Sequence, residues 1–474
     1  MFQPARKHAK RFGRGAIALA GSHFEHPGSH TMAVLLALGL VATLIAASCQ
    51  WPNRTHAVLG PAGAAGVWDA PAVWLGQEPQ IRVRIVEPTE EIVVGGSRLV
   101  LAREASGRVR MFRSPLIVRA AGTAVTLTEP GGRESTIAGH VDLESGDPRP
   151  PTPPRAGTPE YYTDAPTIAV QGVAYAGRVR IMPTAGGVQA INTLGLEPYV
   201  AAVASRELYP SWDLAAYEAQ TIAARSYALQ SMALPKFRDR AWHVESSTVD
   251  QAYPGHTTHE RSIQAAINTR GRVLAYRGRV LRAYYSSTSG GRSGSAADTW
   301  PTGPGFEYNL DAPIQAHDVV HDSDASRLHR WQVVRTADDV TRRLRAWGER
   351  SGHSLKSARA VTNITVDRVN RVGRPASYVV GERNGVRHRL SAEQLRIALN
   401  HAAPGLADLA GDARVRSGDF EVTAAGSRLV IRGRGFGHGV GMCQFGAQAL
   451  AKRGWTAEAI VRNYYPGASI ERAY

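Results

Sequence analysis

Residues 196–210, LEPYVAAVASRELYP, constrain this chain most, because a proline near each end confines any helix there to one short segment. Pro198 suits the first position of a helix, where its missing N–H has no intrahelical partner. Pro210 marks the other end, since proline cannot continue a helix. The stretch therefore predicts a short helix with defined ends.

The apolar positions of this helix place an acid on its buried side. Leu196, Val200 and Val203 recur at helical spacing on one face, and Glu207 continues the same line. Burial disfavours a charged carboxylate and raises its pKa, as a general acid working near neutral pH requires. A glutamate that bends back to solvent in the last turn is the alternative, and the pattern alone leaves both open.

Length and composition indicate a globular protein with one large domain or two. The chain has 474 residues, of which 43% are apolar and 20% charged, and its 48 Gly and 27 Pro favour a strand-rich body with many turns. The formal charge of +16 favours a polyanionic partner, whether nucleic acid, anionic lipid or acidic polysaccharide. No nucleic-acid-binding motif is recognisable, so we expect no nucleic-acid partner.

The first 49 residues have the layout of an export signal. Residues 1–14 are basic, and 33–47 form an apolar run that is short for a bilayer span, although an uncleaved anchor stays open. We expect 1–49 to be a signal peptide or lipoprotein signal and 50–78, rich in Ala, Gly and Pro, to be a flexible tether. The protein would then lie in the bacterial cell envelope.

The apolar run ends in LIAASC, which resembles the lipobox of bacterial lipoproteins and makes Cys49 a candidate for lipidation. Ala46 stands where that motif usually has Leu, so lipidation and simple cleavage both stay open. Membrane contact is expected only through this signal or lipid anchor. Cys443 is the only other cysteine, and a lipidated Cys49 would leave it without a disulfide partner.

Short alternating strands fill the next part of the chain, which we expect to form an N-terminal β-rich part over 79–195. They are predicted at 81–86, 91–94, 98–102, 116–119, 173–179 and 187–192. The proline-rich residues 147–154 predict a loop or linker.

The remainder, 196–474, alternates predicted helices and strands. A helix over 213–233 has Asp213 as its N-cap and a buried stripe beside which Arg225 would lie as an ordinary surface arginine. A hairpin over 273–285 turns at Arg277 and Gly278, and the polar loop 286–294 suits a sugar, an anion or a plain flexible loop. Further helices are predicted at 337–352 and 391–399, and strands at 361–366 and 376–380.

Glycine occupies every second position from Gly433 to Gly441, between a predicted strand and a helix. Such a run lets the backbone approach a ligand or another chain segment closely. A phosphate loop is disfavoured because the Walker lysine is missing. Within the run, His438 could be a proton shuttle, a polar anchor or a structural histidine. Cys443 could be a nucleophile or a small buried thiol at a helix start.

Histidines near the middle of the chain provide little evidence for a metal. His256 and His259 lie three residues apart beside Glu260, without a third ligand nearby. We predict no metal and no cofactor.

Three separated blocks resemble the SpoIID/LytB family of bacterial cell-wall proteins, named for stage II sporulation protein D and the amidase enhancer. The first runs from LEPYV at 196–200 through Glu207 to EAQTIAARSYAL at 218–229. The second comprises DQAYPG at 250–255, YSSTSGG at 285–291 and Trp300. The third is GFGHGVGMCQFGA at 435–447 with YYPG at 464–467. The resemblance spans about residues 79–474, but the region 315–430 matches only loosely.

The resemblance implies an α+β fold, a mixed β-rich core with a few helices forming a glycan-binding groove, and a catalytic core over 196–474. It implies a lytic transglycosylase that cleaves peptidoglycan glycan strands, preferentially those without stem peptides. Glu207 matches the family's catalytic glutamate and would act as both acid and base. A single carboxylate suffices for this reaction, unlike the paired acids of ordinary glycosidases.

By motif position, seven further residues become candidate groove or support residues: Gln220, Arg225, Gln251, Tyr253, Ser287, His438 and Gln444. Two departures from the family pattern matter. Some members bind zinc through Cys and His just before the position of Gln251, where residues 245–250 supply neither. The family often has Ser at the position of Cys443, which disfavours a thiol nucleophile.

A second function stays open. The amidase-enhancer branch of the family suggests a non-catalytic glycan-binding protein that recruits or activates a cell-wall amidase. Peptidoglycan glycan strands are therefore the expected partner under both readings, and an amidase is the additional partner under the second.

Overall fold

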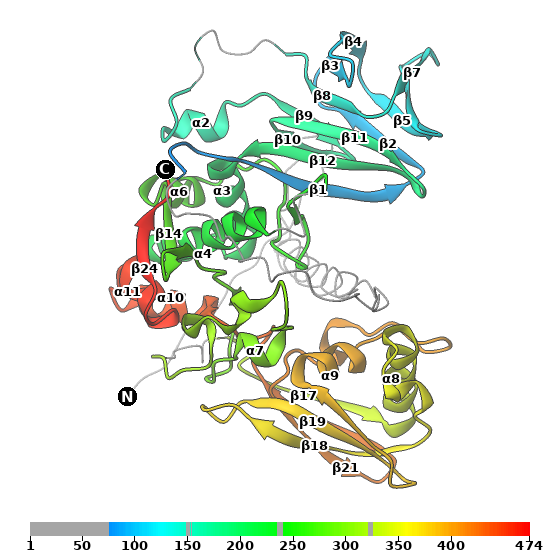
Figure 1. Cartoon of the computed structure of the whole chain (residues 1–474), viewed down its shortest axis with the longest axis vertical. Helices are drawn as coiled ribbons and strands as arrows, with labels where there is room; N and C mark the ends of the chain where they lie inside the picture. Colours follow the sequence, from blue (N-terminus) through cyan, green and yellow to red (C-terminus); the bar gives the residue numbers. More distant parts are fainter. Residues whose placement is uncertain (1–74, 148–151, 153, 235–239, 321–325) are drawn as a thin grey trace, which may run out of the picture.

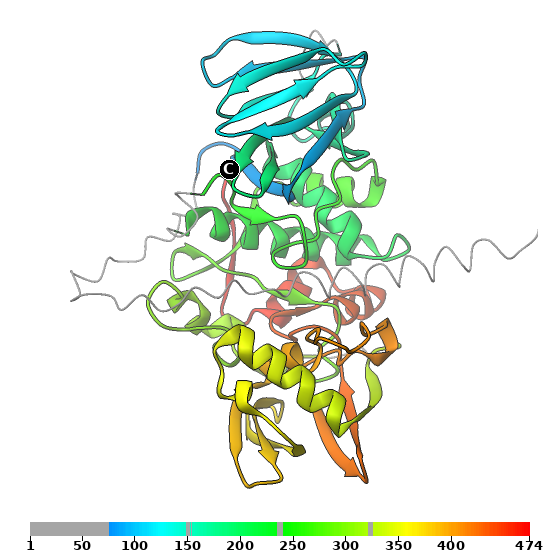
Figure 2. The same cartoon turned by 90° about the vertical axis from the view of Figure 1, so that its right-hand side faces the viewer.

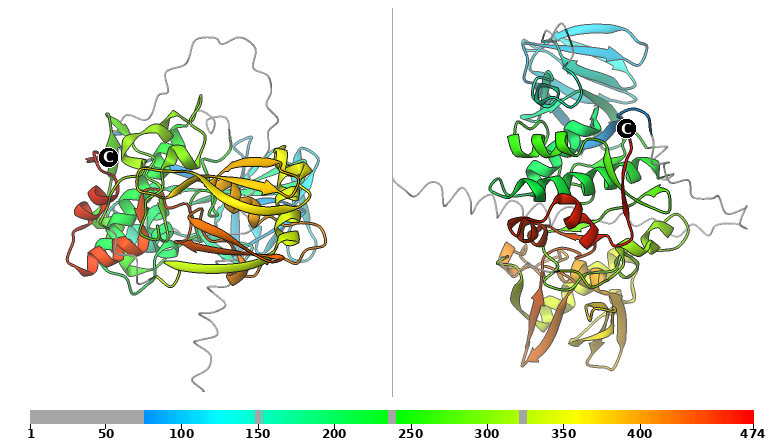
Figure 3. Two further views of the ribbon diagram at one scale, coloured as in Figure 1. Left: turned by 90° about the horizontal axis from the view of Figure 1, so that it is seen from below. Right: turned by 90° about the vertical axis from the view of Figure 1, so that its left-hand side faces the viewer.

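The computed structural model describes residues 75–147, 152, 154–234, 240–320 and 326–474, arranged as three units stacked along the longest axis (Figure 1). Strands of the N-terminal unit lie at one end, helices fill the middle, and a smaller unit of strands and two long helices lies at the other end. Figure 2 and the right-hand view of Figure 3 show the same stacking from two further sides. The expected export signal, Cys49 and residues 50–74 of the tether lie outside the described residues.

Two sheets form the N-terminal unit, with a shared apolar core between them, and their strands are antiparallel except for the parallel pair β1 and β13. The seven-stranded sheet has the order β13-β1-β12-β11-β8-β3-β4, and the six-stranded sheet has the order β10-β9-β2-β5-β6-β7. Their bounds are β1 Gln80–Thr89, β2 Glu91–Gly95, β3 Leu99–Glu104, β4 Val109–Arg113, β5 Leu116–Ala121, β6 Ala124–Thr128, β7 Glu134–Ala138, β8 Val141–Ser145, β9 Thr167–Val170, β10 Val173–Ala176, β11 Arg178–Thr184, β12 Gly187–Gly195 and β13 Val244–Glu245. Among the described residues between 75 and 195, the one helix is α2 (Pro159–Thr163).

Alternation of buried and exposed residues explains these strands. In β2, Ile92 and Val94 are fully buried while Val93 between them is exposed, as the two-residue period of a strand requires. The strands predicted around 81–119 are confirmed as β1, β2, β3 and β5. The single strand predicted at 173–179 was wrong, since it divides into β10 and β11, which belong to different sheets. Gly177 makes the break with a φ of +82°, where a Cβ would meet the Thr193 carbonyl oxygen at 2.4 Å.

Glu78, the last residue of the predicted tether, forms hydrogen bonds and an ion pair with the folded body. Glu78 accepts hydrogen bonds from the Tyr161 hydroxyl at 2.9 Å and the Glu197 N–H at 3.0 Å, and it forms an ion pair with Arg270 at 3.1 Å. Since these contacts join Glu78 to three segments, residue 78 belongs to the folded body. The proline-rich linker predicted at 147–154 lies largely outside the described residues.

Helices pack together in the middle unit: α3 (Leu196–Glu207), α4 (Leu214–Ala233), α6 (Glu260–Asn268), α7 (Ala296–Thr299), α10 (Gln444–Lys452) and α11 (Ala457–Tyr464). The predicted start of the first helix was two residues late. Leu196 is its first residue, so Pro198 is its third and still falls where an N–H has no intrahelical partner. Helix α4 is buried nearly all round rather than along one stripe, and it carries six polar residues without exposed surface: Gln220, Thr221, Arg225, Ser226, Gln230 and Ser231.

The predicted hairpin turns where expected but ends early. Strands β14 (Arg272–Tyr276) and β15 (Arg279–Val280) meet at a turn with positive φ at Arg277 and Gly278, and β24 (Ser469–Arg472) completes their sheet. Residues 281–284 leave this sheet because the Arg282 guanidinium enters a buried polar network with Gln230, Ser231 and Tyr227. Strand β16 (Tyr285–Ser286) then pairs in parallel with β23 (Met442–Cys443).

The region 315–430, expected as a loosely matching part of the core, largely coincides with a third unit that has its own apolar cluster. Its strands form two sheets, β17-β22-β21 and β18-β19-β20, with bounds β17 Arg330–Thr336, β18 Val361–Val369, β19 Pro375–Glu382, β20 Arg387–Ser391, β21 Phe420–Ala425 and β22 Arg428–Arg434. Helices α8 (Ala337–Ser351) and α9 (Ala392–Leu399) complete it, close to the predicted helices. Short 3-10 helices occur at Glu307–Leu310, Ala312–Ile314, Ser354–Ser357 and Gly411–Ala413.

These elements confirm the α+β class. Within the described part of the chain, no helix is both long and apolar enough to cross a membrane.

Candidate active site

Glu207 is the last residue of α3, and its half-buried side chain is held by two donors from other parts of the chain. The Ala252 backbone N–H donates to Oε1 at 3.2 Å, and the Gln444 side-chain amide donates to Oε2 at 3.0 Å. Ala252 lies in the loop before α6, and Gln444 is the first residue of α10. Both carboxylate oxygens are thus oriented by groups more than 40 residues away in sequence.

Burial raises the pKa of Glu207 above its ordinary value. The two hydrogen bonds and the nearby Arg206 charge favour the carboxylate and lower the pKa, but removal from water outweighs them. The position at the end of α3 acts in the same direction as burial, since the negative end of a helix dipole disfavours an anion. The site therefore favours the neutral carboxyl, the form that can donate a proton, more than water does.

Two buried amides lie behind the acid. Besides Glu207, the Gln444 amide N–H contacts Oε1 of Gln220 at 3.4 Å, and Gln220 on α4 is fully buried. The Gln220 Nε2 has no hydrogen-bond partner among the described residues. The structure thus brings together Glu207 and Gln220 of the first motif block and Gln444 of the third.

Gln251 is a support residue beside this group. Its Oε1 accepts from the Tyr199 hydroxyl at 3.0 Å, and its Nε2 donates to the Tyr285 hydroxyl at 3.0 Å and the Ala224 carbonyl at 3.2 Å. Tyr285 lies close enough that the Glu207 charge contributes, after burial, to raising the pKa of its phenol. Sequence reasoning quoted Tyr285 in a motif but did not select it, because only the β16–β23 pairing places it here.

Arg225 and Tyr253 do not reach the acid through any contact among the described residues. The Arg225 guanidinium has no exposed surface and forms a two-pronged ion pair with Glu197, with contacts of 3.0 and 2.7 Å. The Tyr253 hydroxyl donates to Oδ1 of Asn192 in β12 at 2.8 Å. Arg225 thus joins α4 to α3, and Tyr253 joins the loop before α6 to the N-terminal sheet. The expectation of a surface arginine was wrong, because Arg225 is a buried support residue.

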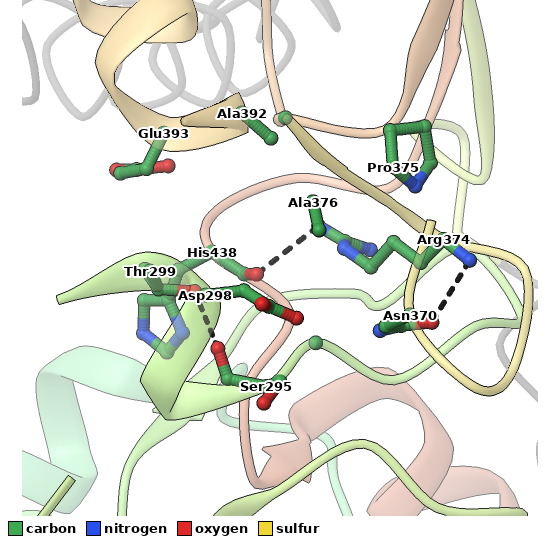
Figure 4. Close-up of a pocket in the computed structure, with 12 residues that line it drawn as sticks. Ser295, Asp298, Thr299, Asn370, Arg374, Pro375, Ala376, Ala392, Glu393 and His438 are labelled. Carbon is green, nitrogen blue, oxygen red and sulfur yellow. Dashed lines mark hydrogen bonds between the residues drawn. The ribbon is translucent and has the colours of Figure 1, made fainter. Parts of the chain in front are cut away.

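His438 lies at a different place, in a pocket between the middle and C-terminal units (Figure 4). Its Nδ1 accepts from the Val440 N–H at 3.0 Å, and the edge of its ring contacts Trp300 at a centroid distance of 4.9 Å. Burial lowers its pKa to about 4, so the ring is neutral near pH 7. Of the sequence alternatives, this geometry favours the polar anchor over the proton shuttle.

The glycine run serves contact between chain segments. Thr288 forms an isolated bridge with Phe436, and Gly294 forms one with Val440, so the polar loop 286–294 pairs with the glycine run. A Cβ at Gly435 would meet the Thr288 carbonyl oxygen at 2.5 Å. Two uses were expected for these glycines, close approach to a ligand or to another chain segment. The structure shows the second.

Ser287 and Cys443 support the start of α10. The Ser287 carbonyl accepts from the Phe445 N–H at 3.1 Å, while its side chain is half-buried. Cys443 is the N-cap, its Sγ accepting from the Gly446 N–H at 3.3 Å, and the thiol is buried. This favours the small buried thiol over the nucleophile, and it fixes the helix that carries Gln444.

An aromatic cluster is formed by Tyr209, Trp212 and Phe445, of which Tyr209 is exposed and Trp212 is buried. Tyr209 follows Glu207 by two residues and is 46% exposed, with its ring centroid 5.4 Å from Trp212 and 5.9 Å from Phe445. The Tyr217 hydroxyl donates to the Tyr209 carbonyl at 3.0 Å and thereby fixes this turn. Sequence reasoning missed the cluster because Phe445 comes from α10, far along the chain.

Of the two histidines considered for a metal, His259 has a structural role. His259 is the N-cap of α6, its Nδ1 accepting from the Ser262 N–H at 3.2 Å, and its ring stacks on Tyr217. Across the described residues, no three or more His, Cys, Asp or Glu side chains are grouped as metal ligands.

Known proteins match this chain over the region that contains the acid. The family model described as stage II sporulation protein matches residues 184–276. Stage II sporulation protein D of Bacillus subtilis is 26% identical over 299 residues, covering 60% of this chain and 77% of that protein. The amidase enhancer of the same organism is 26% identical over 334 residues, covering 66% of this chain but only 46% of the enhancer. An uncharacterised protein of Brachyspira hyodysenteriae is 25% identical over 312 residues, covering 64% of this chain and 74% of that protein.

The segment matched by the family model includes α3 with Glu207, α4 and α6. The chain is therefore similar to proteins of the SpoIID/LytB family over a region that contains Glu207.

Proposed function

We propose that this protein is a lytic transglycosylase that cleaves peptidoglycan glycan strands, with Glu207 as its general acid and base. The observation that carries the proposal is the half-buried Glu207 carboxyl, whose pKa is raised by burial and whose two oxygens are oriented by Ala252 and Gln444. A neutral carboxyl fixed in this way is poised to donate a proton to a glycosidic oxygen.

In the proposed reaction, protonated Glu207 gives its proton to the oxygen of the glycosidic bond, which breaks and leaves an oxocarbenium-like centre on the muramyl sugar. The sugar's own 6-hydroxyl then attacks that centre. The Glu207 carboxylate takes the hydroxyl proton and returns to its starting state. The product is a 1,6-anhydro-muramyl end, and neither water nor a second carboxylate takes part.

Asp250 lies two residues before Ala252, the backbone donor to Glu207, but its carboxylate binds other groups. Asp250 accepts hydrogen bonds from the Tyr227 hydroxyl and the Glu245 N–H, both at 2.9 Å. Among the described residues, no Asp or Glu hydrogen-bonds to Glu207. The proposed reaction itself needs only one acid, in contrast to the paired carboxylates of ordinary glycosidases.

The exposed ring of Tyr209 suits the same substrate. Pyranose rings present an apolar C–H face, and an aromatic ring fixed beside the acid can bind that face with little loss of side-chain entropy. Denuded strands, which lack bulky stem peptides, are the proposed substrate. Residues 1–49 would export the protein to the cell envelope, with Cys49 as the proposed lipid anchor.

The test compares wild type with Glu207→Gln on denuded glycan strands of defined length, with mass analysis of the products. We expect 1,6-anhydro ends from wild type and a loss of about 10²–10⁴-fold in Glu207→Gln, since the amide cannot donate an acidic proton. Glu91→Gln, which changes an exposed carboxylate of the N-terminal sheet, is the matched control and should cleave normally. Wild type that binds the strands but releases no anhydro product would contradict the proposal.

A second candidate function is that of a non-catalytic glycan-binding protein that stimulates a cell-wall amidase. The similarity to a protein named amidase enhancer favours it. Under this function, Glu207→Gln should stimulate an added amidase as well as wild type does. Loss of stimulation in a folded Glu207→Gln variant would exclude a role in binding alone.

A further inference from the structure

The positive charge of the chain is concentrated in the C-terminal unit. Residues 330–434 contain 20 Lys and Arg against 10 Asp and Glu, which is +10 of the chain's formal +16. The unit comprises less than a quarter of the sequence. Nothing in the proposed cleavage at Glu207 requires this charge, because Glu207 and its contacts belong to the middle unit.

Part of this charge forms a row along one strand. In β22, Leu429 and Ile431 are buried in the core of the unit, so the residues between them face outward. The outward positions are Arg428, Val430, Arg432 and Arg434. At about 3.4 Å per residue along a strand, the Cα atoms of Arg428 and Arg432 lie about 14 Å apart and those of Arg432 and Arg434 about 7 Å apart, in one line.

Neighbouring strands extend the row. Arg330 of β17 is paired directly opposite Arg434, and Gln332 is opposite Arg432 and accepts a hydrogen bond from it at 2.8 Å. Only one acid, Glu421 of β21, lies on the outward face of the three strands, opposite Arg432. None of the four arginines forms an ion pair with the described residues. We call this surface, made by Arg330, Arg428, Arg432 and Arg434, the arginine row.

Folding does not account for this arrangement. Like charges directly opposite each other in a sheet destabilise it, so the Arg330 and Arg434 pair costs stability. The opposite face of the same sheet is covered, since its apolar residues share a core with Val340 and Leu344 of α8. Among the described residues, the outward face has no apolar cover of this kind, and the loop at Gly290 approaches it at the Arg434 end.

We propose that the arginine row binds a linear anionic polymer with repeated phosphodiester groups. Arginine is suited to this ligand because its planar guanidinium donates two parallel hydrogen bonds to one phosphate. Charges in a line at multiples of one spacing match a polymer with regularly repeated phosphates. This site is separate from the Glu207 site and would hold the protein on an anionic polymer while glycan is bound elsewhere.

A lipid surface fits the row less well. Binding to a membrane interface generally combines basic residues with large apolar side chains that enter the lipid. On the outward face, the apolar residues are Val334, which is 47% exposed, Val430 and Ala425. No aromatic residue or leucine of the three strands faces outward there.

The experiment measures binding of the purified full-length chain to poly(glycerol phosphate) of defined length across a series of salt concentrations. We expect wild-type affinity to fall steeply with salt, because each neutralised phosphate releases counterions. Arg428→Gln, Arg432→Gln and Arg434→Gln should each weaken binding by about fivefold and make the salt dependence less steep. Arg432→Lys should recover part of the loss, since it keeps the charge without the two-pronged geometry.

The matched control is Arg345→Gln, which removes an exposed arginine of α8 in the same unit. It changes the net charge equally but lies on the helix that covers the opposite face of the sheet, and it should bind like wild type. An equal loss in Arg345→Gln, or no binding of the polymer by wild type, would overturn the proposal. Vesicles of anionic phospholipid form the second arm, and row-dependent binding to vesicles without binding to the polymer would overturn it in favour of a membrane.

Discussion

The chemistry of Glu207 depends on a balance between burial, which favours the neutral carboxyl, and two donated hydrogen bonds, which favour the carboxylate. The effect of burial is the larger one, so the pKa of Glu207 rises. Because Ala252 and Gln444 still fix the two oxygens, the acid keeps its orientation in either protonation state. A residue that must donate a proton and later accept one needs this combination.

The raised pKa also predicts how stability depends on pH. The pKa of Glu207 is higher in the folded protein than in the unfolded chain. This side chain therefore contributes stability below its unfolded pKa of about 4.3, and the contribution is lost as pH rises through the folded pKa. Wild type should therefore lose stability relative to Glu207→Gln over that window, with a constant difference above it. Urea unfolding of both proteins at stepped pH measures this, and a difference independent of pH would show that burial does not control the carboxyl.

At the scale of elements, the glycine run determines where α10 begins and hence where Gln444 lies. Gly441 has a φ of +69°, and a Cβ on it would lie 2.0 Å from the Tyr284 carbonyl oxygen. This glycine allows the β23 backbone to pass against the chain just before β16. The parallel pairing of β16 and β23 then places Tyr285 and Gln444 on the same side as the acid.

Gly441→Ala should destabilise the protein by about 3 kcal/mol or more, since a strained backbone conformation and a steric clash add together. Gly454→Ala is the control, because Gly454 has a similar φ of +84° but nothing within 4 Å of the added Cβ. Strain alone should cost it about 1–2 kcal/mol. Equal losses in urea unfolding would mean that close approach contributes nothing at Gly441.

Local sequence predicted most of these elements, because alternation and capping are short-range patterns. Ser391 forms the capping box that begins α9, and Gly352 ends α8 in the left-handed conformation, so both helices fall close to the predicted ranges. The errors occur where distant contacts override the pattern. Residues 173–179 divide between two sheets, and Arg282 turns out of its predicted strand into a buried network.

At the scale of the whole molecule, the C-terminal unit is joined to the middle one through buried arginine contacts. Arg374 is 4% exposed and donates to the carbonyls of Ser289, Arg292 and His438 at 3.0, 3.1 and 3.1 Å. Asp419 lies 3.7 Å from it and also pairs with Arg292. The loop 286–294 is therefore held by the C-terminal unit on one side and the glycine run on the other.

Arg374→Leu should cost about 3–5 kcal/mol, because it leaves buried carbonyls without donors and Asp419 without one of its cations. We expect the C-terminal unit to open before the rest, seen as a separate transition in urea unfolding and as early cleavage in limited proteolysis. The control is Arg371→Leu, three residues from Arg374 in sequence. It removes an exposed ion pair with Asp318 and should lower the free energy of unfolding by at most about 1 kcal/mol. A single unchanged transition in Arg374→Leu would show that the units are coupled by other contacts.

The sequence by itself determined the short helix, the acid on its buried side, the glycine run and the family resemblance, because each is written in neighbouring residues or in a motif. Only the tertiary structure decided the partners of that acid. Gln444 lies 237 residues from Glu207 in sequence, and Arg225 turned from an expected surface residue into a buried partner of Glu197. The physical reason is that hydrogen bonds and burial depend on distance in space, which the packing of the helices and sheets sets and local pattern does not record.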